Sequence, residues 1–214
     1  MIKYIDTRLY FNQDGVFCFN ADKHSTSVPA VMLQGTLDGA CSVYSLIMNL
    51  LIIRRIKYED TQIYNVPDDP QTRKLFKSLF EDNGMHKYGE SYYWLKKRLV
   101  ENFSDRVSCV HKLKFNVNTI KETIDKDLPV IISLSGSGWA HASLCIGYEY
   151  DDWAGVTKLL LLDPSGDMPK CCCWNAFVDL FVPEPRKKYK YHYVNDKGDN
   201  LVKLDDFLII TPIK

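Results

Sequence analysis

The sequence predicts an α+β fold in a single domain, 1–214, and three observations support this. Apolar residues recur at helical spacing in the first half of the chain. After Asp105 the pattern changes to alternation and short aliphatic runs, which are typical of strands. With 46% hydrophobic and 13% aromatic residues, the chain has enough apolar material for its own core. Helices followed by mainly antiparallel strands are the layout of an α+β protein.

Three regions are expected within this domain. Residues 1–30 alternate polar and apolar side chains around the turn residues of 12–15, which indicates an N-terminal β-hairpin. Residues 31–105 form a helical lobe. Its helices are expected at 40–56, at a segment that contains Leu75, Leu79 and Phe80 and ends near Asn83 and Gly84, and at 91–103.

Residues 106–214 are expected to form a β-sheet lobe. The strands are predicted at 106–115, 129–135, 141–150, 157–163 and 207–214, with a short helix at 117–126. The segment 184–193 is basic and aromatic and alternates after two prolines. This pattern favours an edge hairpin with its lysines toward solvent over a nucleic-acid-binding patch.

Charge and hydropathy exclude several classes of partner. Lys plus Arg and Asp plus Glu are 27 each, so no net charge favours nucleic acid or an anionic membrane. The longest apolar stretch, 46–53, is far shorter than the roughly 20 residues of a membrane-spanning helix. The polar N-terminal segment does not resemble a signal peptide, so we expect a cytoplasmic protein.

The seven cysteines indicate a reducing compartment. Their number is odd and none forms a CxxC pair, so a disulfide framework is not expected. The run 171–173 places three cysteines side by side, which is poor geometry for one tetrahedral metal site. No metal and no cofactor are expected, and the sequence leaves the role of these three residues open.

Cys41 is the candidate nucleophile. It lies at the predicted start of the longest helix, directly after Asp38, Gly39 and Ala40. The unpaired N–H groups and the dipole of a helix N-terminus stabilise a thiolate. Gln34, seven residues upstream, is the candidate donor to an oxyanion, together with the backbone N–H of Cys41.

His141 is the candidate base and Asp163 the candidate residue that orients it. His141 follows a glycine-rich run, 135–140, and begins an apolar strand. Asp163 ends the next predicted strand, before a Pro-Ser-Gly turn. In adjacent antiparallel strands the start of one lies beside the end of the next, so the two side chains are expected to meet. Each residue alone has an ordinary structural explanation, and it is their order and placement that favour a catalytic triad.

Two segments resemble the papain-like cysteine peptidases. GTLDGACSVYSLIMNLL, 35–51, resembles their nucleophile segment, with a glutamine upstream and the cysteine at the head of a central helix. GWAHASLCIGYEYDDWAGVTKLLLLDPSG, 138–166, resembles the C39-like branch more specifically. The resemblance implies a papain-like fold, in which the helical lobe packs on a mainly antiparallel β-sheet. It also implies Gln34, Cys41, His141 and Asp163 as the catalytic set.

The departures from these families are local. Ala40-Cys41-Ser42 replaces the usual residues around the nucleophile, the gap between Gln34 and Cys41 is one residue longer, and His141 follows the cysteine by only 100 residues.

The resulting hypothesis is a thiol-dependent hydrolase that cleaves a peptide or isopeptide bond in a protein or peptide substrate. Two alternatives remain open at this point. The same triad could serve a glutamine deamidase or transglutaminase, and the scaffold could be a catalytically inert interaction module. The sequence also leaves open an activating or regulatory protein as a partner.

Overall fold

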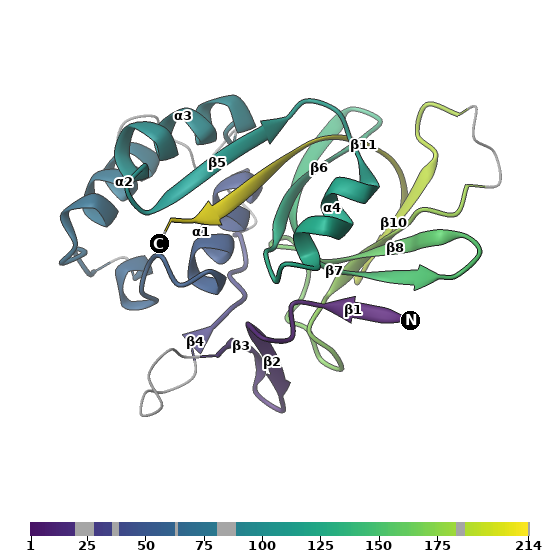
Figure 1. The fold of residues 1–214 in the computed structure, drawn as a ribbon, viewed down its shortest axis with the longest axis horizontal. Helices are drawn as coiled ribbons and strands as arrows, with labels where there is room; N and C mark the ends of the chain where they lie inside the picture. Colours follow the sequence, from purple (N-terminus) through teal and green to yellow (C-terminus); the bar gives the residue numbers. More distant parts are fainter. Residues whose placement is uncertain (20–27, 36–38, 63, 81–88, 183–186, 214) are drawn as a thin grey trace.

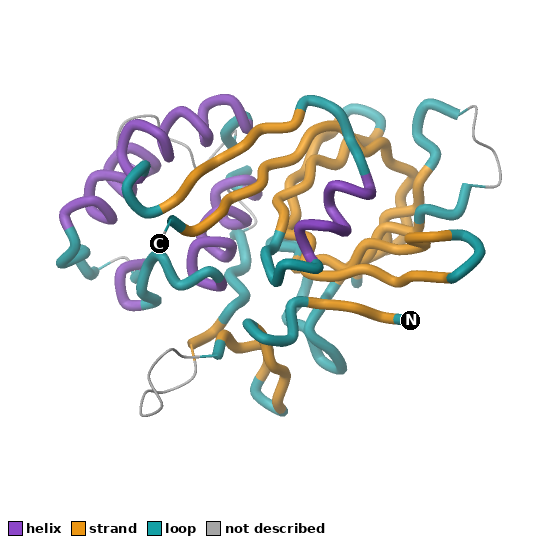
Figure 2. The backbone as a smooth tube through the Cα atoms, in the orientation of Figure 1, coloured by secondary structure: helices purple, strands orange, loops and turns teal. Residues whose placement is uncertain are grey.

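The chain is mostly β-structure built around a closed barrel (Figures 1 and 2). The computed structural model describes residues 1–19, 28–35, 39–62, 64–80, 89–182 and 187–213. Within them, six antiparallel strands follow one another around the barrel in the order β7, β6, β11, β10, β9 and β8, and β8 pairs again with β7. The strands are β6 (Val130–Gly136), β7 (Trp139–Asp151), β8 (Gly155–Leu162), β9 (Ala176–Asp179), β10 (Tyr191–Asn195) and β11 (Gly198–Pro212).

The predicted helical lobe on an open sheet is therefore wrong. The sheet closes because β9 and β10 connect the outer edges of β8 and β11, and closure satisfies the backbone groups that open edges would leave unpaired. The strands predicted from the sequence did not include β9, and the last of them covered only 207–214 instead of the full length of β11. Asp205 and Asp206 interrupt the apolar pattern there, at a register shift between Leu204 and Phe207.

Two further strands extend the barrel sheet. β1 (Ile2–Tyr4) pairs with β7, and β5 (Val107–Lys112) pairs with the C-terminal half of β11. A separate small sheet holds β2 (Leu9–Asn12), β3 (Gly15–Cys18) and β4 (Val28–Pro29). The hairpin expected around residues 12–15 is present as β2 and β3.

The helices gather mainly on one side of the barrel (Figure 2). They are α1 (Cys41–Ile52), the 3₁₀ turn η1 (Glu59–Thr61), α2 (Pro70–Phe80), α3 (Tyr92–Phe103) and α4 (Val117–Ile124). α1 packs on β7 and β6, and α3 packs on α2 and β5. The predicted end of the second helix, near Asn83 and Gly84, lies outside the described residues. None of the described helices is long and apolar enough to cross a membrane.

α1 is buried because it is apolar on nearly every face. Ten of its twelve residues are buried, including Leu46, Met48 and Leu50. β7 is buried on both faces from Ala142 to Tyr148, because the barrel core lies on one face and α1 covers the other. This packing fixes α1 against the strand that carries His141.

The basic segment is not an edge hairpin. β10 lies between β9 and β11 and pairs with both, so its alternate residues face the barrel interior and the outer surface. Residues 184–186 of the segment lie outside the described residues.

Gly147 holds β1 close to β7. A Cβ atom at this position would lie 2.6 Å from the Lys3 carbonyl oxygen and 2.8 Å from the Tyr4 Cβ. We expect Gly147→Ala to push β1 away and to lower the free energy of unfolding by about 1–3 kcal/mol, measured by urea denaturation. In a chain that lacks residues 1–4 the same substitution should cost much less. If Gly147→Ala lowered the free energy of unfolding equally in both chains, the added methyl group would not clash with β1.

Candidate active site

Cys41 is the first residue of α1, as the sequence predicted. The helix begins after Ala40, no side chain caps it, and no acidic residue lies in its first turn. Unpaired N–H groups and the helix dipole therefore favour a negative charge at this end. The start of α1 is tied to the segment before α3, because Ser42 Oγ donates to the Glu90 carbonyl oxygen at 2.8 Å.

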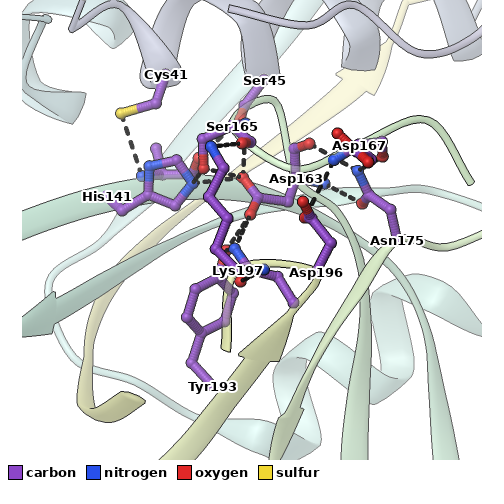
Figure 3. Close-up of polar contacts among 12 residues, drawn as sticks. Cys41, Ser45, His141, Asp163, Ser165, Asp167, Asn175, Tyr193, Asp196 and Lys197 are labelled. Atoms are coloured by element: carbon purple, nitrogen blue, oxygen red, sulfur yellow. Dashed lines mark hydrogen bonds and ion pairs between the residues drawn. The ribbon is translucent and has the colours of Figure 1, made fainter. Parts of the chain in front are cut away.

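The Cys41 thiol lies against the beginning of β7. The Ala142 backbone N–H donates to Cys41 Sγ at 3.4 Å, and the neighbouring His141 ring lowers the pKa of the thiol. Figure 3 shows the Cys41 sulfur on one side of the imidazole and the Asp163 carboxylate on the other. Because Nε2 of His141 contacts Asp163, Nδ1 is the nitrogen that remains for the sulfur.

The expected contact between His141 and Asp163 is present. The distance from His141 Nε2 to Asp163 Oδ1 is 2.6 Å. His141 is the third residue of β7, and Asp163 follows the last residue of β8. The antiparallel pairing of β7 with β8 brings these two positions together.

Asp163 is fully buried, and the turn that follows it supplies several donors. The Ser165 backbone N–H and hydroxyl both donate to Asp163 Oδ1, each at 2.9 Å. Asn175 holds the backbone of Asp163 on both sides: Asn175 Oδ1 accepts from the Asp163 N–H at 2.7 Å, and Asn175 Nδ2 donates to the Asp163 carbonyl oxygen at 2.9 Å. A buried carboxylate needs such partners because water cannot reach it.

β10 supplies the remaining contacts to the carboxylate. The Tyr193 hydroxyl donates to Asp163 Oδ2, and Asn195 Nδ2 donates to the same oxygen at 3.1 Å. Sequence reasoning missed Ser165, Asn175, Tyr193 and Asn195. The period of two in a strand places Tyr193 and Asn195 on one face, but no sequence signal indicates which carboxylate that face meets.

Gln34 lies beside this turn. Its backbone N–H donates to the Pro164 carbonyl oxygen at 2.7 Å, directly after Asp163. Its side-chain Oε1 is buried and accepts no hydrogen bond within the part of the chain that the structure describes. The structure therefore brings all four sequence-predicted residues to one end of the barrel.

A polar stripe on α1 fixes the helix on the barrel. Cys41, Ser45 and Asn49 are spaced by four residues and so lie on one face. Ser45 Oγ donates to the Ala142 carbonyl oxygen at 3.2 Å, and Asn49 Nδ2 donates to the Pro129 carbonyl oxygen at 3.1 Å. The backbone of Ala142 thus contacts α1 through both its N–H and its C=O, which sets the position of Cys41 relative to His141.

Trp139 lies two residues before His141 on β7 and packs beside Tyr193. Its ring packs on Gly136, where a Cβ atom would lie 2.3 Å from Trp139 Cε2. The ring centroid of Trp139 is 6.5 Å from that of Tyr193, which is itself 6.3 Å from the His141 ring. Tyr193 is buried, whereas Trp139 is exposed.

The electrostatics favour a thiolate–imidazolium pair. Burial opposes ionisation of Cys41, but the hydrogen bonds and charge of His141 and the N–H groups of Ala142 and Ser42 lower the thiol pKa overall. Burial alone would lower the pKa of His141, but its contacts with Asp163 and Cys41 raise it to about 9. Burial would raise the pKa of Asp163, yet His141, Tyr193 and Ser165 hold it well below its usual range.

Cys41 differs from four of the other cysteines. Burial raises the pKa of Cys18 and Cys145 to about 12 and that of Cys109 and Cys173 to about 11. All seven cysteines lie in described segments and are free thiols. Across those segments, no group of three or more His, Cys, Asp or Glu residues is arranged to hold a metal ion.

Comparison with known proteins gives similar solved structures. No family model matches the sequence, and no curated protein matches it. The crystal structure of UfSP from C. elegans is similar to the chain, with a TM-score of 0.47 and 14% sequence identity. The match covers 100% of this chain and 34% of that one, so the chain spans about a third of the length of UfSP. Similarity at this level carries no information on activity, so the geometry of the site has to support the function.

The charge pair predicts an unusual dependence of stability on pH. The lowered thiol pKa of Cys41 adds stability as the pH rises, whereas the raised imidazole pKa of His141 adds stability that is lost as the pH rises. In the wild type these two contributions oppose each other. In Cys41→Ala only His141 remains, with a folded pKa that Asp163 keeps raised. Its stabilisation is complete below about pH 6.5 and is lost as the pH rises toward the folded pKa.

We therefore expect the free energy of unfolding of Cys41→Ala, relative to wild type, to fall between about pH 6.5 and 9. Denaturant unfolding at a series of pH values measures it. The decline should disappear in the double variant Cys41→Ala/His141→Gln. A Cys41→Ala curve parallel to that of wild type would show that His141 carries no raised pKa.

Proposed function

We propose that the chain is a thiol-dependent hydrolase that cleaves a peptide or isopeptide bond, with Cys41 as nucleophile, His141 as acid and base and Asp163 as the residue that orients the imidazole. The observation that carries this proposal is the thiol at a helix N-terminus beside an imidazole that lowers its pKa, with that imidazole bound to a buried carboxylate. Such an arrangement activates a cysteine for attack on a carbonyl carbon.

The reaction follows from the protonation states of the pair. The Cys41 thiolate attacks the carbonyl carbon, and the carbonyl oxygen takes up negative charge. His141 holds the proton at Nδ1, where it can pass to the leaving amine as the C–N bond breaks. The neutral imidazole then removes a proton from water, which attacks the thioester and regenerates the thiol. Asp163 keeps Nε2 protonated throughout.

Membership of the papain-like superfamily, and of its C39-like branch, stays a prediction that rests on the two sequence segments. Because the proposed reaction cleaves a peptide or isopeptide bond, we propose a protein or peptide as the substrate.

Alkylation of Cys41 tests whether the pair is assembled. We expect iodoacetamide to modify Cys41 well below pH 8.5, and much faster than Cys109 or Cys173, because His141 stabilises its thiolate. Peptide mass spectrometry at a series of pH values measures each cysteine separately. His141→Ala should move Cys41 to an ordinary thiol profile. A wild-type Cys41 with that ordinary profile would overturn the proposed mechanism and favour an interaction module.

Hydrolysis tests the function itself. A library of peptidyl aminocoumarin substrates should be cleaved by wild type and not by Cys41→Ala, and full cleavage by that variant would overturn the proposal. Mass spectrometry of glutamine-containing peptides distinguishes the related acyl transfer, because deamidation leaves the chain intact and adds about one mass unit.

Gln34 provides a separate test of oxyanion stabilisation. We propose that the side-chain amide N–H group of Gln34 donates to the oxyanion, because the Gln34 backbone is bound to the turn that follows Asp163. Gln34→Leu should lower kcat/KM about a hundredfold, since one donor in such a site has about this effect. The alkylation profile of Cys41 should stay unchanged in this variant. Unchanged kcat/KM would exclude the role.

A further inference from the structure

The two carboxylate oxygens of Asp163 have different partners (Figure 3). Oδ1 faces His141 on β7 and Ser165 in the turn after β8. Among the described residues, Oδ2 is bound by β10 alone, through Tyr193 and Asn195. Rotation of the carboxylate away from His141 would break both contacts with β10, so this strand determines which oxygen His141 meets.

Asn195 also determines the direction of the Tyr193 hydroxyl proton. Its Nδ2 donates to the Tyr193 hydroxyl oxygen at 3.1 Å, as well as to Asp163 Oδ2. An oxygen that accepts from Asn195 has its own proton available for another acceptor, and the carboxylate is that acceptor. Asn195 and Tyr193 therefore act together. If either side chain turned away, the other would lose one of its hydrogen bonds.

We propose that Tyr193 and Asn195 are positioning residues that hold the Asp163 carboxylate in the orientation that keeps His141 protonated and directed at Cys41. This inference rests on the proposed function. β10 is well suited to the task, because it is paired on both sides within the closed barrel. Tyr193 is only 3% exposed and Asp163 is 0% exposed, so water cannot replace the lost donors after a substitution.

The charged groups around Asp163 come from several elements. His141 faces it from β7 and Tyr193 from β10, with Cys41 behind the imidazole. Lys197, in the turn between β10 and β11, donates to the Ser165 carbonyl oxygen. Asp196 in the same turn accepts from the Asp167 backbone N–H at 3.1 Å.

Tyr193→Phe leaves these other groups in place and removes one of the two β10 donors that fix Asp163 Oδ2. The carboxylate is then free to rotate away from His141, which weakens its contact with the imidazolium. The pKa of His141 should therefore fall.

Nitrogen NMR of the histidine side chains tests the proposal on the whole chain without any substrate. In Tyr193→Phe we expect the titration midpoint of His141 to fall by about one pH unit from that of wild type. Asn195→Ala should lower it in the same direction by a smaller amount, and the double variant should shift less than the sum, because the two residues act as a unit. The spectrum of His141→Asn identifies the His141 signal among the five histidines.

Tyr191→Phe is the matched control. Tyr191 lies two residues earlier on the same face of β10, where its ring packs near Phe115. The midpoint of His141 in this variant should equal that of wild type. If Tyr193→Phe does not fold, as judged by circular dichroism, Asn195→Ala carries the test alone. A His141 midpoint that stays at the wild-type value in folded Tyr193→Phe or Asn195→Ala would overturn the proposal.

The test of the positioning role can be distinguished from the test of the proposed function. If Cys41→Ala hydrolyses substrate normally, the peptidase mechanism fails, but a shifted His141 titration would still assign Tyr193 and Asn195 to the control of this carboxylate. If hydrolysis depends on Cys41 and the titration does not shift, the positioning role alone is excluded.

Discussion

The full burial of the Asp163 carboxylate is the constraint on which the rest of the site depends. A charge without water has to be matched by donors from the protein, because an unpartnered buried carboxylate is strongly destabilising. Here the donors come from β7, from the turn after β8 and from β10. Three segments far apart in sequence therefore have to come together around this carboxylate. His141 is one of the donors that they supply.

Closure of the barrel makes this meeting possible. In an open sheet that ended at β8, the strand β10 would have no reason to lie near Asp163. β9 pairs with β8 on one side and β10 on the other, which brings the inner face of β10 to the end of β8. The same closure removes two exposed edges. The stability of the barrel and the geometry of the carboxylate thus share one cause.

The thiol reaches the imidazole through a second, independent contact surface. α1 is buried along almost its whole length, so its position is set by packing against β7 and β6. Ser45 and Asn49 add directional hydrogen bonds to that packing and prevent α1 from sliding or rotating on the barrel. The start of α1 is then held against the strand that carries His141, where the imidazole lowers the pKa of the Cys41 thiol.

The sequence by itself determined the helices, most strands and four residues that come together at one end of the barrel, because helical and strand periods and turn residues are local properties of the chain. It could place Asp163 beside His141, since neighbouring antiparallel strands fix that relation. Only the tertiary structure decided that the sheet closes, that 191–195 is a central strand, and that Tyr193 and Asn195 face Asp163. These facts depend on pairings between strands that no local pattern specifies, and on a buried charge whose partners become visible only once the barrel is closed.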